Sequence, residues 1–146
     1  MNSMSDKVFL DTNVLVYLFD RDAPIKQERA RAILETEGRS SNIVISTQVL
    51  EEFYVSVTRK LRKPLPEGEA EGAVRDLTAL EVVEVDVDMI LRSIVAARRH
   101  KISLWDTLIV EAARARGCRR LLTEDLQDGQ QFDDLRVENP FRTSAS

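Results

Sequence analysis

The sequence predicts an α/β fold in which a parallel sheet lies between helices. Short apolar runs alternate with longer segments whose apolar residues recur at helical spacing, an order typical of parallel strands joined by helices. The apolar run at residues 8–10 ends in a carboxylate, Asp11, as expected for a strand whose carboxyl end reaches the rim of a sheet. The length of 146 residues suits one domain with its own core, so we expect a single domain over 1–146, with flexible ends at 1–5 and 143–146.

The first part of the chain is expected to form two strands and three helices. Their predicted positions are, in order, a strand at 7–10, a short helix at 14–19, a helix at 25–34 that starts around Asp22, Ala23 and Pro24, a strand at 43–45, and a helix capped by Ser46 or Thr47. Ala30, Ile33 and Leu34 share helical spacing, and the residues at 43–45 are β-branched. The last of these helices has an apolar face made of Val49, Leu50, Phe53, Tyr54 and Val57, which favours packing in the core over packing on a second subunit.

The second part begins after Pro64 and Pro66, which end that helix. The predicted elements are a helix at 67–79, a strand at 82–85, a helix at 89–99 capped by Asp86 or Asp88, a helix that follows 102–106 and runs to about 116, a strand at 120–123, and a last short strand at 135–137. Gly117 is a usual residue just beyond a helix end. An acid-rich loop is expected at 124–129.

The composition excludes several classes of protein. With 43% hydrophobic and 32% charged residues, the chain is typical of a globular domain and not of a disordered one. No apolar run approaches the roughly 18 residues of a transmembrane helix, and the start of the chain lacks the apolar region of a signal peptide. The single cysteine, Cys118, excludes an internal disulfide, so we expect a cytoplasmic protein without membrane contact. The single histidine, His100, argues against a His-based zinc site or a His-dependent triad.

The charge pattern is compatible with a nucleic-acid partner without requiring one. The formal net charge is −4, but lysines and arginines gather at 59–63 and at 92–101. Basic stripes beside an acidic pocket suit a nucleic-acid substrate. From charge alone, solvated helix faces are the more common explanation of such stripes.

Four acids are placed where they could converge. Asp11 ends the first strand, and Asp125 closely follows the strand at 120–123. Asp106 opens a helix, and Glu52 lies in the first turns of the helix that follows the strand at 43–45. In a parallel sheet, these positions collect at one edge. Packed carboxylates repel unless a cation is present, and an oxygen-rich cluster suits Mg²⁺ or Mn²⁺, which activate water for phosphodiester hydrolysis.

Each acid also has an ordinary structural explanation. Asp106 would serve as a helix N-cap, Asp125 as a turn residue, and Glu52 as a solvated helix residue. Asp11 is the hardest to explain in this way, because an acid that ends a buried strand needs a partner or a metal. The acid-rich loop lacks the alternating acids and the terminal glutamate of an EF-hand, so a calcium site of that kind is rejected.

Four segments resemble, in order, the motifs of the PIN domain family, and within it those of VapC-like toxins. They are 8–15 (VFLDTNVL), 45–54 (ISTQVLEEFY), 103–109 (SLWDTLI) and 122–126 (LTEDL). Glu52 matches the family's glutamate better than Glu51 does, because it directly precedes the aromatic pair. No single motif is specific, whereas four in this order and spacing are, and together they cover nearly the whole chain.

The resemblance implies a Rossmann-like, three-layer α/β/α fold with a central parallel sheet. It implies a ribonuclease that depends on Mg²⁺ or Mn²⁺, an RNA substrate, a small antitoxin that occupies the active-site groove, and a homodimer. The metal ligands would be Asp11, Glu52, Asp106 and Asp125, with Asn13 and Thr123 as hydrogen-bonding residues that orient them, and Asp128 as either a further acid near the metal or a surface turn residue.

Four alternatives to the toxin nuclease remain at this point. A phosphatase that forms an aspartyl-phosphate at Asp11 is disfavoured, because such enzymes need a second acid at position 13, where this chain has Asn13. A receiver-type phosphoacceptor is disfavoured, since residues 119–122 lack the expected lysine. An RNA-processing PIN nuclease without an antitoxin, or a catalytically silent module that binds RNA or a partner, would keep the basic helices. Only the silent module would have no need of four acids.

Overall fold

The structure, a computed structural model, describes residues 6–142. The flexible ends expected at 1–5 and 143–146 lie outside these residues. The strands are β1 (Val8–Leu10), β2 (Ile43–Ser46), β3 (Glu81–Val83), β4 (Arg120–Leu122), β5 (Gln131–Phe132) and β6 (Leu135–Glu138). The helices are α1 (Thr12–Val16), the 3-10 helix η1 (Tyr17–Phe19), α2 (Pro24–Gly38), α3 (Thr47–Arg59), α4 (Glu67–Leu77), α5 (Val87–His100) and α6 (Leu104–Ala115).

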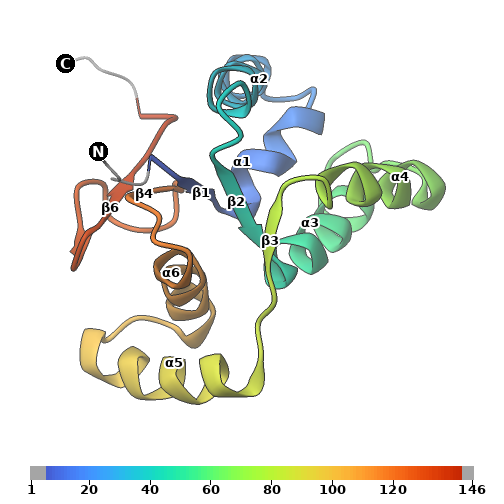
Figure 1. Ribbon diagram of the computed structural model, residues 1–146. Helices are drawn as coiled ribbons and strands as arrows, with labels where there is room; N and C mark the ends of the chain where they lie inside the picture. The colour runs from blue at the N-terminus through green and yellow to red at the C-terminus, as the bar shows by residue number, and fades with distance from the viewer. Residues whose placement is uncertain (1–5, 143–146) are drawn as a thin grey trace.

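The strands form one six-stranded sheet in the order β3-β2-β1-β4-β6-β5. All neighbouring pairs are parallel except β5 with β6. Helices α5 and α6 lie on one side of the strands and α1 and α2 on the other, while α3 and α4 stand beside β3 (Figure 1). The predicted α/β/α architecture with a mostly parallel central sheet is therefore confirmed.

The strand order changes direction at β1. The chain passes from β1 to β2 and β3 on one side and then returns to β4 on the opposite side of β1. Such a reversal opens a crevice at the carboxyl ends of the two strands that flank it. Here these strands are β1 and β4, which pair from Val8 with Arg120 to Leu10 with Leu122. The residues just after Leu10 and Leu122 therefore meet at this crevice.

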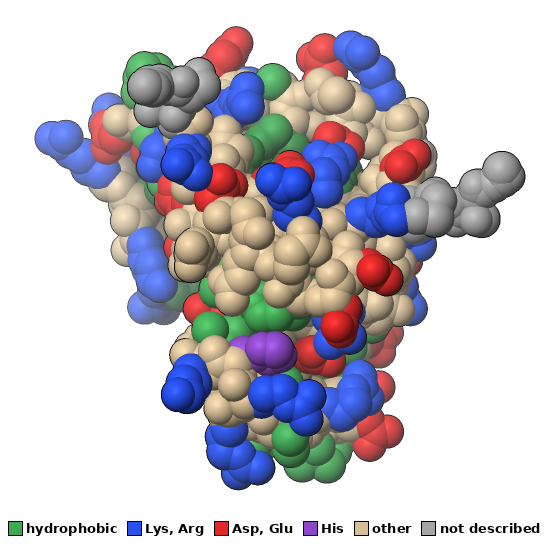
Figure 2. All heavy atoms as spheres, turned by 90° about the vertical axis from the view of Figure 1, so that its left-hand side faces the viewer, with side chains coloured by type: hydrophobic (Ala, Val, Ile, Leu, Met, Phe, Trp, Pro, Cys, Tyr) green, Lys and Arg blue, Asp and Glu red, His purple; other side chains and the backbone are tan. Residues whose placement is uncertain are grey.

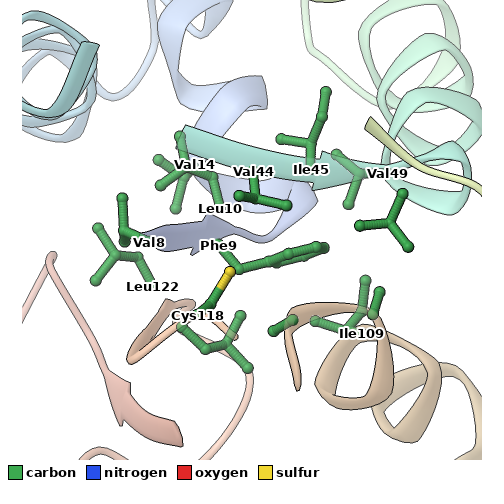
Figure 3. Close-up of a cluster of buried hydrophobic side chains, with 14 of the residues drawn as sticks. Val8, Phe9, Leu10, Val14, Val44, Ile45, Val49, Ile109, Cys118 and Leu122 are labelled. Atoms are coloured by element: carbon green, nitrogen blue, oxygen red, sulfur yellow. The ribbon is translucent and has the colours of Figure 1, made fainter. Parts of the chain in front are cut away.

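The central strands are buried on both faces. Val8, Phe9 and Leu10 of β1 have no exposed surface, and the alternation of a strand sends their side chains to both sides of the sheet. In Figure 3, Phe9 extends from β1 toward Ile109 of α6, and Val14 and Val49 lie among the core residues beside β2. Burial of each large apolar side chain contributes about 1.5–3 kcal/mol to stability. This rigid sheet fixes the position of β1's carboxyl end.

The helix that carries Glu52 packs as its sequence predicts. Phe53 and Val57 of α3 are fully buried in the core, Tyr54 is half-buried against it, and Val55 on the other side is exposed. Ser46 caps the helix, because its side chain accepts a hydrogen bond from the backbone N–H of Val49. The expected core packing of this face is thus confirmed.

Three details differ from the expected element boundaries. The first helix begins at Thr12 and not at 14, because Asp11 itself accepts a hydrogen bond from the Thr12 N–H and starts the helix. The cap position of α2 is Ala23, with no side-chain hydrogen bond, so Asp22 does not cap it. Helix α6 is capped by Ser103, which excludes the N-cap explanation of Asp106.

The sequence also failed to predict β5, which forms a short antiparallel hairpin with β6. The two strands are joined by a tight turn in which Asp133 has φ 55°. A two-residue strand offers too little periodicity to be recognised. In the part of the chain that the structure describes, no helix is both long and apolar enough to cross a membrane.

Candidate metal-binding nuclease site

Asp11 is a buried carboxylate at the carboxyl end of β1. It has 5% of its surface exposed. Its Oδ1 accepts a hydrogen bond of 2.7 Å from the Thr12 N–H, and its Oδ2 accepts one of 2.8 Å from the Thr123 hydroxyl. Burial raises the pKa of Asp11 to about 7, against the opposing effect of these two hydrogen bonds, and the charges of Asp125 and Glu52 raise it further. Burial at the strand end therefore disfavours the charged form of Asp11.

Thr123, the first residue after β4, connects three parts of the site. Its hydroxyl donates to Asp11 and accepts from Asn13 Nδ2 at 3.2 Å and from the Asp125 N–H at 3.0 Å. Asn13 Nδ2 also donates to Asp125 Oδ2 at 3.2 Å. Asn13 and Thr123 thus hydrogen-bond to Asp125 and Asp11, and the loop after β4 is tied to α1.

Glu52 reaches the same edge from α3. Its Oε1 accepts a hydrogen bond of 2.9 Å from the Thr12 hydroxyl, and its Oε2 accepts one of 3.2 Å from Gln48 Nε2. The same Gln48 nitrogen donates to the backbone oxygen of Trp105, also at 3.2 Å. Gln48 therefore links the helix of Glu52 to the helix of Asp106. The sequence did not single out Gln48 or Thr12, because amides and hydroxyls are common on helix surfaces.

Asp106 lies in the first turn of α6, directly above the Ser103 cap. Burial raises its pKa, a hydrogen bond with the Ser103 side chain opposes the rise, and the charges of Asp125 and Glu52 add to it. Each of the two acids with a raised pKa therefore feels the charges of Glu52 and Asp125. The fold brings all four predicted acids into one electrostatic neighbourhood.

The four acids are neighbours, but their side chains do not converge on one point where they could coordinate an ion. Within residues 6–142, no group of three or more His, Cys, Asp or Glu side chains is arranged so that it could hold a metal ion. Mutual repulsion keeps unneutralised carboxylates apart. Coordination of an ion would therefore require side chains to rotate toward it.

The residues present fit a divalent cation in two respects. The donors are oxygens of carboxylates, which suit Mg²⁺ or Mn²⁺ better than softer metals. In addition, Asn13 Oδ1 is buried and accepts no hydrogen bond from any residue that the structure describes. A water molecule carried by an ion would supply the missing donor, since buried acceptors are rarely left unpaired.

A groove of about 610 Å³ opens beside the acids. Its lining includes Asn13, Glu52 and Asp125 together with Lys60 and Leu61. Both apolar and polar side chains line it. The lining also includes Thr12, Val16, Tyr17, Asp20, Glu51, Val55 and Ser56.

One polar cluster at this groove was missed from the sequence. The Tyr17 hydroxyl donates to Glu124, and Lys26 donates both to that hydroxyl, at 3.1 Å, and to Glu124, at 3.0 Å. Burial and the hydrogen bond to Glu124 raise the pKa of Tyr17. The hydrogen bonds that Lys26 makes with Tyr17 and Glu124 raise the pKa of Lys26. Glu124 directly precedes Asp125, so this cluster anchors the same loop. Its members are too far apart in the sequence to form a motif.

Asp128 lies apart from these contacts. Its side chain accepts hydrogen bonds from the Asn139 N–H and from Arg142, which lower its pKa. It lines a different hollow, together with Arg29 and Arg120. The structure thus does not bring Asp128 into the hydrogen-bond network of the four acids.

The basic cluster at 92–101 lies on α5. Lys and Arg side chains surround an apolar area in the lower part of Figure 2, which corresponds to this helix. Arg92, Arg99 and Arg114 line a hollow of about 440 Å³ there, with Glu111 and Asp133 as the acids. The other cluster, at 59–63, supplies Lys60 to the groove beside the acids.

Comparisons with known proteins bear on the family and the fold of this chain. A family profile described as PIN domain matches residues 8–134. Comparison with curated proteins gave no match. Among solved structures, the chain is similar to a toxin–antitoxin complex from Klebsiella pneumoniae, with 20% identity, coverage of 94% of this chain and 100% of that chain, and a TM-score of 0.66.

Two further structures resemble the chain to the same degree. For VapC20 from Mycobacterium tuberculosis, a toxin that cleaves the sarcin-ricin loop, identity is 18%, coverage is 89% of this chain and 99% of that chain, and the TM-score is 0.66. For DNA-bound VapBC from Salmonella typhimurium, identity is 20%, coverage is 92% of this chain and 98% of that chain, and the TM-score is 0.65. At this identity the structures establish a common fold. Because the family profile spans most of the sequence, the chain belongs to the PIN domain family.

Proposed function

We propose that this protein is a ribonuclease that depends on Mg²⁺ or Mn²⁺ and acts as a VapC-like toxin of a type II toxin–antitoxin pair. The observation that carries the proposal is the buried carboxylate of Asp11, which shares one electrostatic neighbourhood with Asp125 and Glu52 at the crevice between β1 and β4. Support for RNA as the substrate comes from a similar structure, which is a toxin that cleaves the sarcin-ricin loop.

In this proposal, Asp11, Glu52, Asp106 and Asp125 hold the ion. When bound, the ion supplies the positive charge that activates water and stabilises the charge that builds up on the phosphodiester. The other polar residues keep the acids in place, Thr123 at Asp11 and Asn13 at Asp125. The groove that Lys60 helps to line receives the strand on one side of the cleaved bond.

A small antitoxin is the second proposed partner. Support comes from similar structures that are toxin–antitoxin complexes, including DNA-bound ones. A homodimer is proposed as well, since α5 exposes a row of apolar side chains that includes Ile90, Leu91, Ile94 and Val95. Light scattering on the purified protein tests the dimer. An open reading frame for a small DNA-binding protein directly upstream tests the antitoxin.

RNA cleavage by the purified protein tests the nuclease. We expect cleavage with Mg²⁺ or Mn²⁺ and none with EDTA, and we expect Asp11→Asn to lower the rate more than about a hundredfold, because even residues that only orient metal ligands contribute about ten- to a hundredfold. The matched control is Asp88→Asn, on an exposed acid at the start of α5, which should cleave normally. Cleavage that persists in EDTA would refute the metal-dependent mechanism, and undiminished cleavage by the Asp11 variant would remove Asp11 from the site.

A further inference from the structure

We infer that Trp105 is a stacking platform for an unpaired RNA base next to the cleaved phosphodiester, so that the substrate is single-stranded at that position. The inference rests on the proposed ribonuclease function and specifies the substrate class that the site accepts. It is argued from the exposure of Trp105, from its attachment to the acids and from the chemistry of RNA.

Trp105 presents an open aromatic surface. Its side chain is 63% exposed, and it is the one aromatic residue among the large apolar side chains exposed in the described part of the chain. Within residues 6–142, its ring stacks on no other aromatic ring and lies under no lysine or arginine. Because the ring is exposed and unpaired, it is available to a ligand. Burial of an aromatic ring also contributes more to binding than burial of most side chains.

The backbone of Trp105 is fixed beside the carboxylates. Trp105 directly precedes Asp106 in the first turn of α6. Its carbonyl oxygen accepts a hydrogen bond from Gln48 Nε2 at 3.2 Å, and the same nitrogen donates to Glu52 Oε2 at 3.2 Å. The Trp105 backbone and the Glu52 carboxylate therefore lie within two hydrogen-bond lengths of each other. Gln48 itself is buried, so the link does not depend on a mobile surface side chain.

The chemistry of RNA supplies the ligand for this surface. A phosphodiester held at the carboxylates places a base one sugar away on either side. In single strands and loops these bases are splayed out and stack on aromatic side chains, whereas in an A-form helix they are paired and covered by their neighbours. An exposed indole on the residue next to Asp106 would therefore favour RNA that is unpaired near the reacting phosphate. A second copy of this chain would also cover the indole, and the experiment separates the two cases.

Because Trp105 is the only tryptophan in the chain, its fluorescence reports on this position alone. A short single-stranded RNA with a fluorescent end label is titrated into the full-length protein, in Ca²⁺ and in EDTA so that binding is followed without turnover. Anisotropy of the label measures binding, and tryptophan emission measures stacking. A duplex of the same sequence is titrated in parallel. We expect the single strand, and not the duplex, to quench the emission along the same binding curve that the anisotropy gives.

Three variants separate stacking from mere bulk. Trp105→Leu should weaken single-strand binding by between about fivefold and about a hundredfold. Trp105→Phe should retain most of the affinity, since it keeps an aromatic face. Val87→Ala, at another exposed apolar residue, on α5, should bind as the wild type does. Circular dichroism and thermal unfolding show whether each variant is folded.

The possible outcomes are distinct. RNA binding without a change in emission, or with unaltered affinity in Trp105→Leu, overturns the role of Trp105 and leaves the ribonuclease proposal standing. Equal quenching by the duplex overturns the single-stranded substrate class. A change in emission that depends on protein concentration alone identifies a second copy of the chain as the occupant and overturns the inference. Absence of RNA binding in both assays overturns the inference together with the proposed function.

Discussion

The Thr123 hydroxyl donates a 2.8 Å hydrogen bond to Asp11 Oδ2, which joins the carboxyl ends of β4 and β1. Thr123 is fully buried, and its oxygen also accepts hydrogen bonds from Asn13 and from the Asp125 N–H. One side chain therefore sets the relative positions of two of the four acids. It does so from the end of β4, a strand whose Leu121 and Leu122 are buried in the core.

Substitution Thr123→Val keeps the shape of this residue and removes its hydrogen bonds. The pKa of Asp11 should rise further, because the Thr123 bond lowers it, and RNA cleavage should fall by about ten- to a hundredfold. Calorimetric titration with Mn²⁺ should show weaker metal binding by a similar factor. Thr123→Ser is the matched control and should retain both properties. Equal Mn²⁺ affinity in the valine variant and the wild type would show that Thr123 does not position the acids.

The raised pKa of Asp11 predicts how stability depends on pH when no metal is bound. The folded protein keeps a proton on Asp11 up to about pH 7, whereas the unfolded chain loses it near 3.8. The folded state therefore binds more protons between these values, so the free energy of unfolding falls as pH rises through this window and levels off above it. Each unit of pKa difference corresponds to about 1.4 kcal/mol, so a loss of about 2–4 kcal/mol is expected.

Urea unfolding in EDTA at pH 5 and pH 8 measures this loss. Asp11→Asn cannot titrate at this position, so the fall between the two pH values should be smaller in the variant by about 2 kcal/mol. The other titratable groups are present in both proteins, so their contributions to the change in the free energy of unfolding cancel in the comparison. Addition of Mg²⁺ at pH 8 should restore stability to the wild type only, by mass action. If both proteins respond equally to pH, the carboxyl group of Asp11 is not the one with the raised pKa.

Glu51 and Glu52 form a natural pair for testing the proposed ligands. They are adjacent on α3, but only Glu52 is held by Thr12 and Gln48, while Glu51 is exposed at the groove. Glu52→Gln should lower cleavage more than about a hundredfold and weaken Mn²⁺ binding, since it removes a ligand and not only an orienting residue. Glu51→Gln should leave Mn²⁺ binding within about twofold of the wild type. A larger loss of Mn²⁺ binding in the Glu51 variant would exchange the roles of the two residues.

Much of the fold was predictable because the signals are local. The β-branched run at 43–45, the apolar face of Phe53 and Val57, and the left-handed Gly117 all appear in the structure as expected. The short strand β5 and the start of α1 were not. Strand β5 has too few residues to show a pattern. The start of α1 depends on Asp11 acting as a helix cap, a role that was not expected of a residue at a strand end.

The sequence singled out four acids together with Asn13 and Thr123 as site residues, but not Gln48 or Tyr17. Asp11 and Asp125 follow strands that a parallel sheet places side by side, so their meeting follows from topology. The contacts of Gln48 with Glu52 and with the Trp105 oxygen depend on how α3 and α6 pack, which no local pattern encodes. The bonds of Tyr17 and Lys26 to Glu124 likewise join residues about a hundred positions apart along the chain.

Lys60 is expected to contact the RNA backbone, because it lines the same groove as Glu52 and Asp125. Lys60→Glu should weaken binding of single-stranded RNA and reduce the slope of log K against log salt by about 0.7, the amount lost with one phosphate contact. Arg98→Glu, in the basic cluster of α5, tests whether that cluster also contacts RNA. Arg39, whose partner is Glu35, is the control cation for charge reversal. An unchanged slope for both Lys60 and Arg98 would mean that the basic clusters are only solvated faces.

Two parallel hydrogen bonds hold the loop that carries Asp125. Asn13 and Tyr17, four residues apart along α1 and η1, donate to Asp125 and Glu124, which are adjacent in the loop. If either bond alone keeps the loop in place, removal of one should be tolerated and removal of both should not. We therefore expect Asn13→Ala and Tyr17→Phe each to lower the free energy of unfolding by about 0.5–1.5 kcal/mol.

The double variant should lose more than the sum of the single losses, by about 0.5–1 kcal/mol, because the two bonds share one loop. Urea unfolding of the four proteins of the cycle measures this coupling. Mn²⁺ titration of the same proteins measures its consequence, since only a displaced Asp125 weakens the metal site. Tyr17→Phe leaves the salt bridge between Lys26 and Glu124 in place, so its effect reports on the hydroxyl alone. Strict additivity, together with wild-type Mn²⁺ affinity in the double variant, would mean that the strand end at Thr123 and not α1 fixes the position of Asp125.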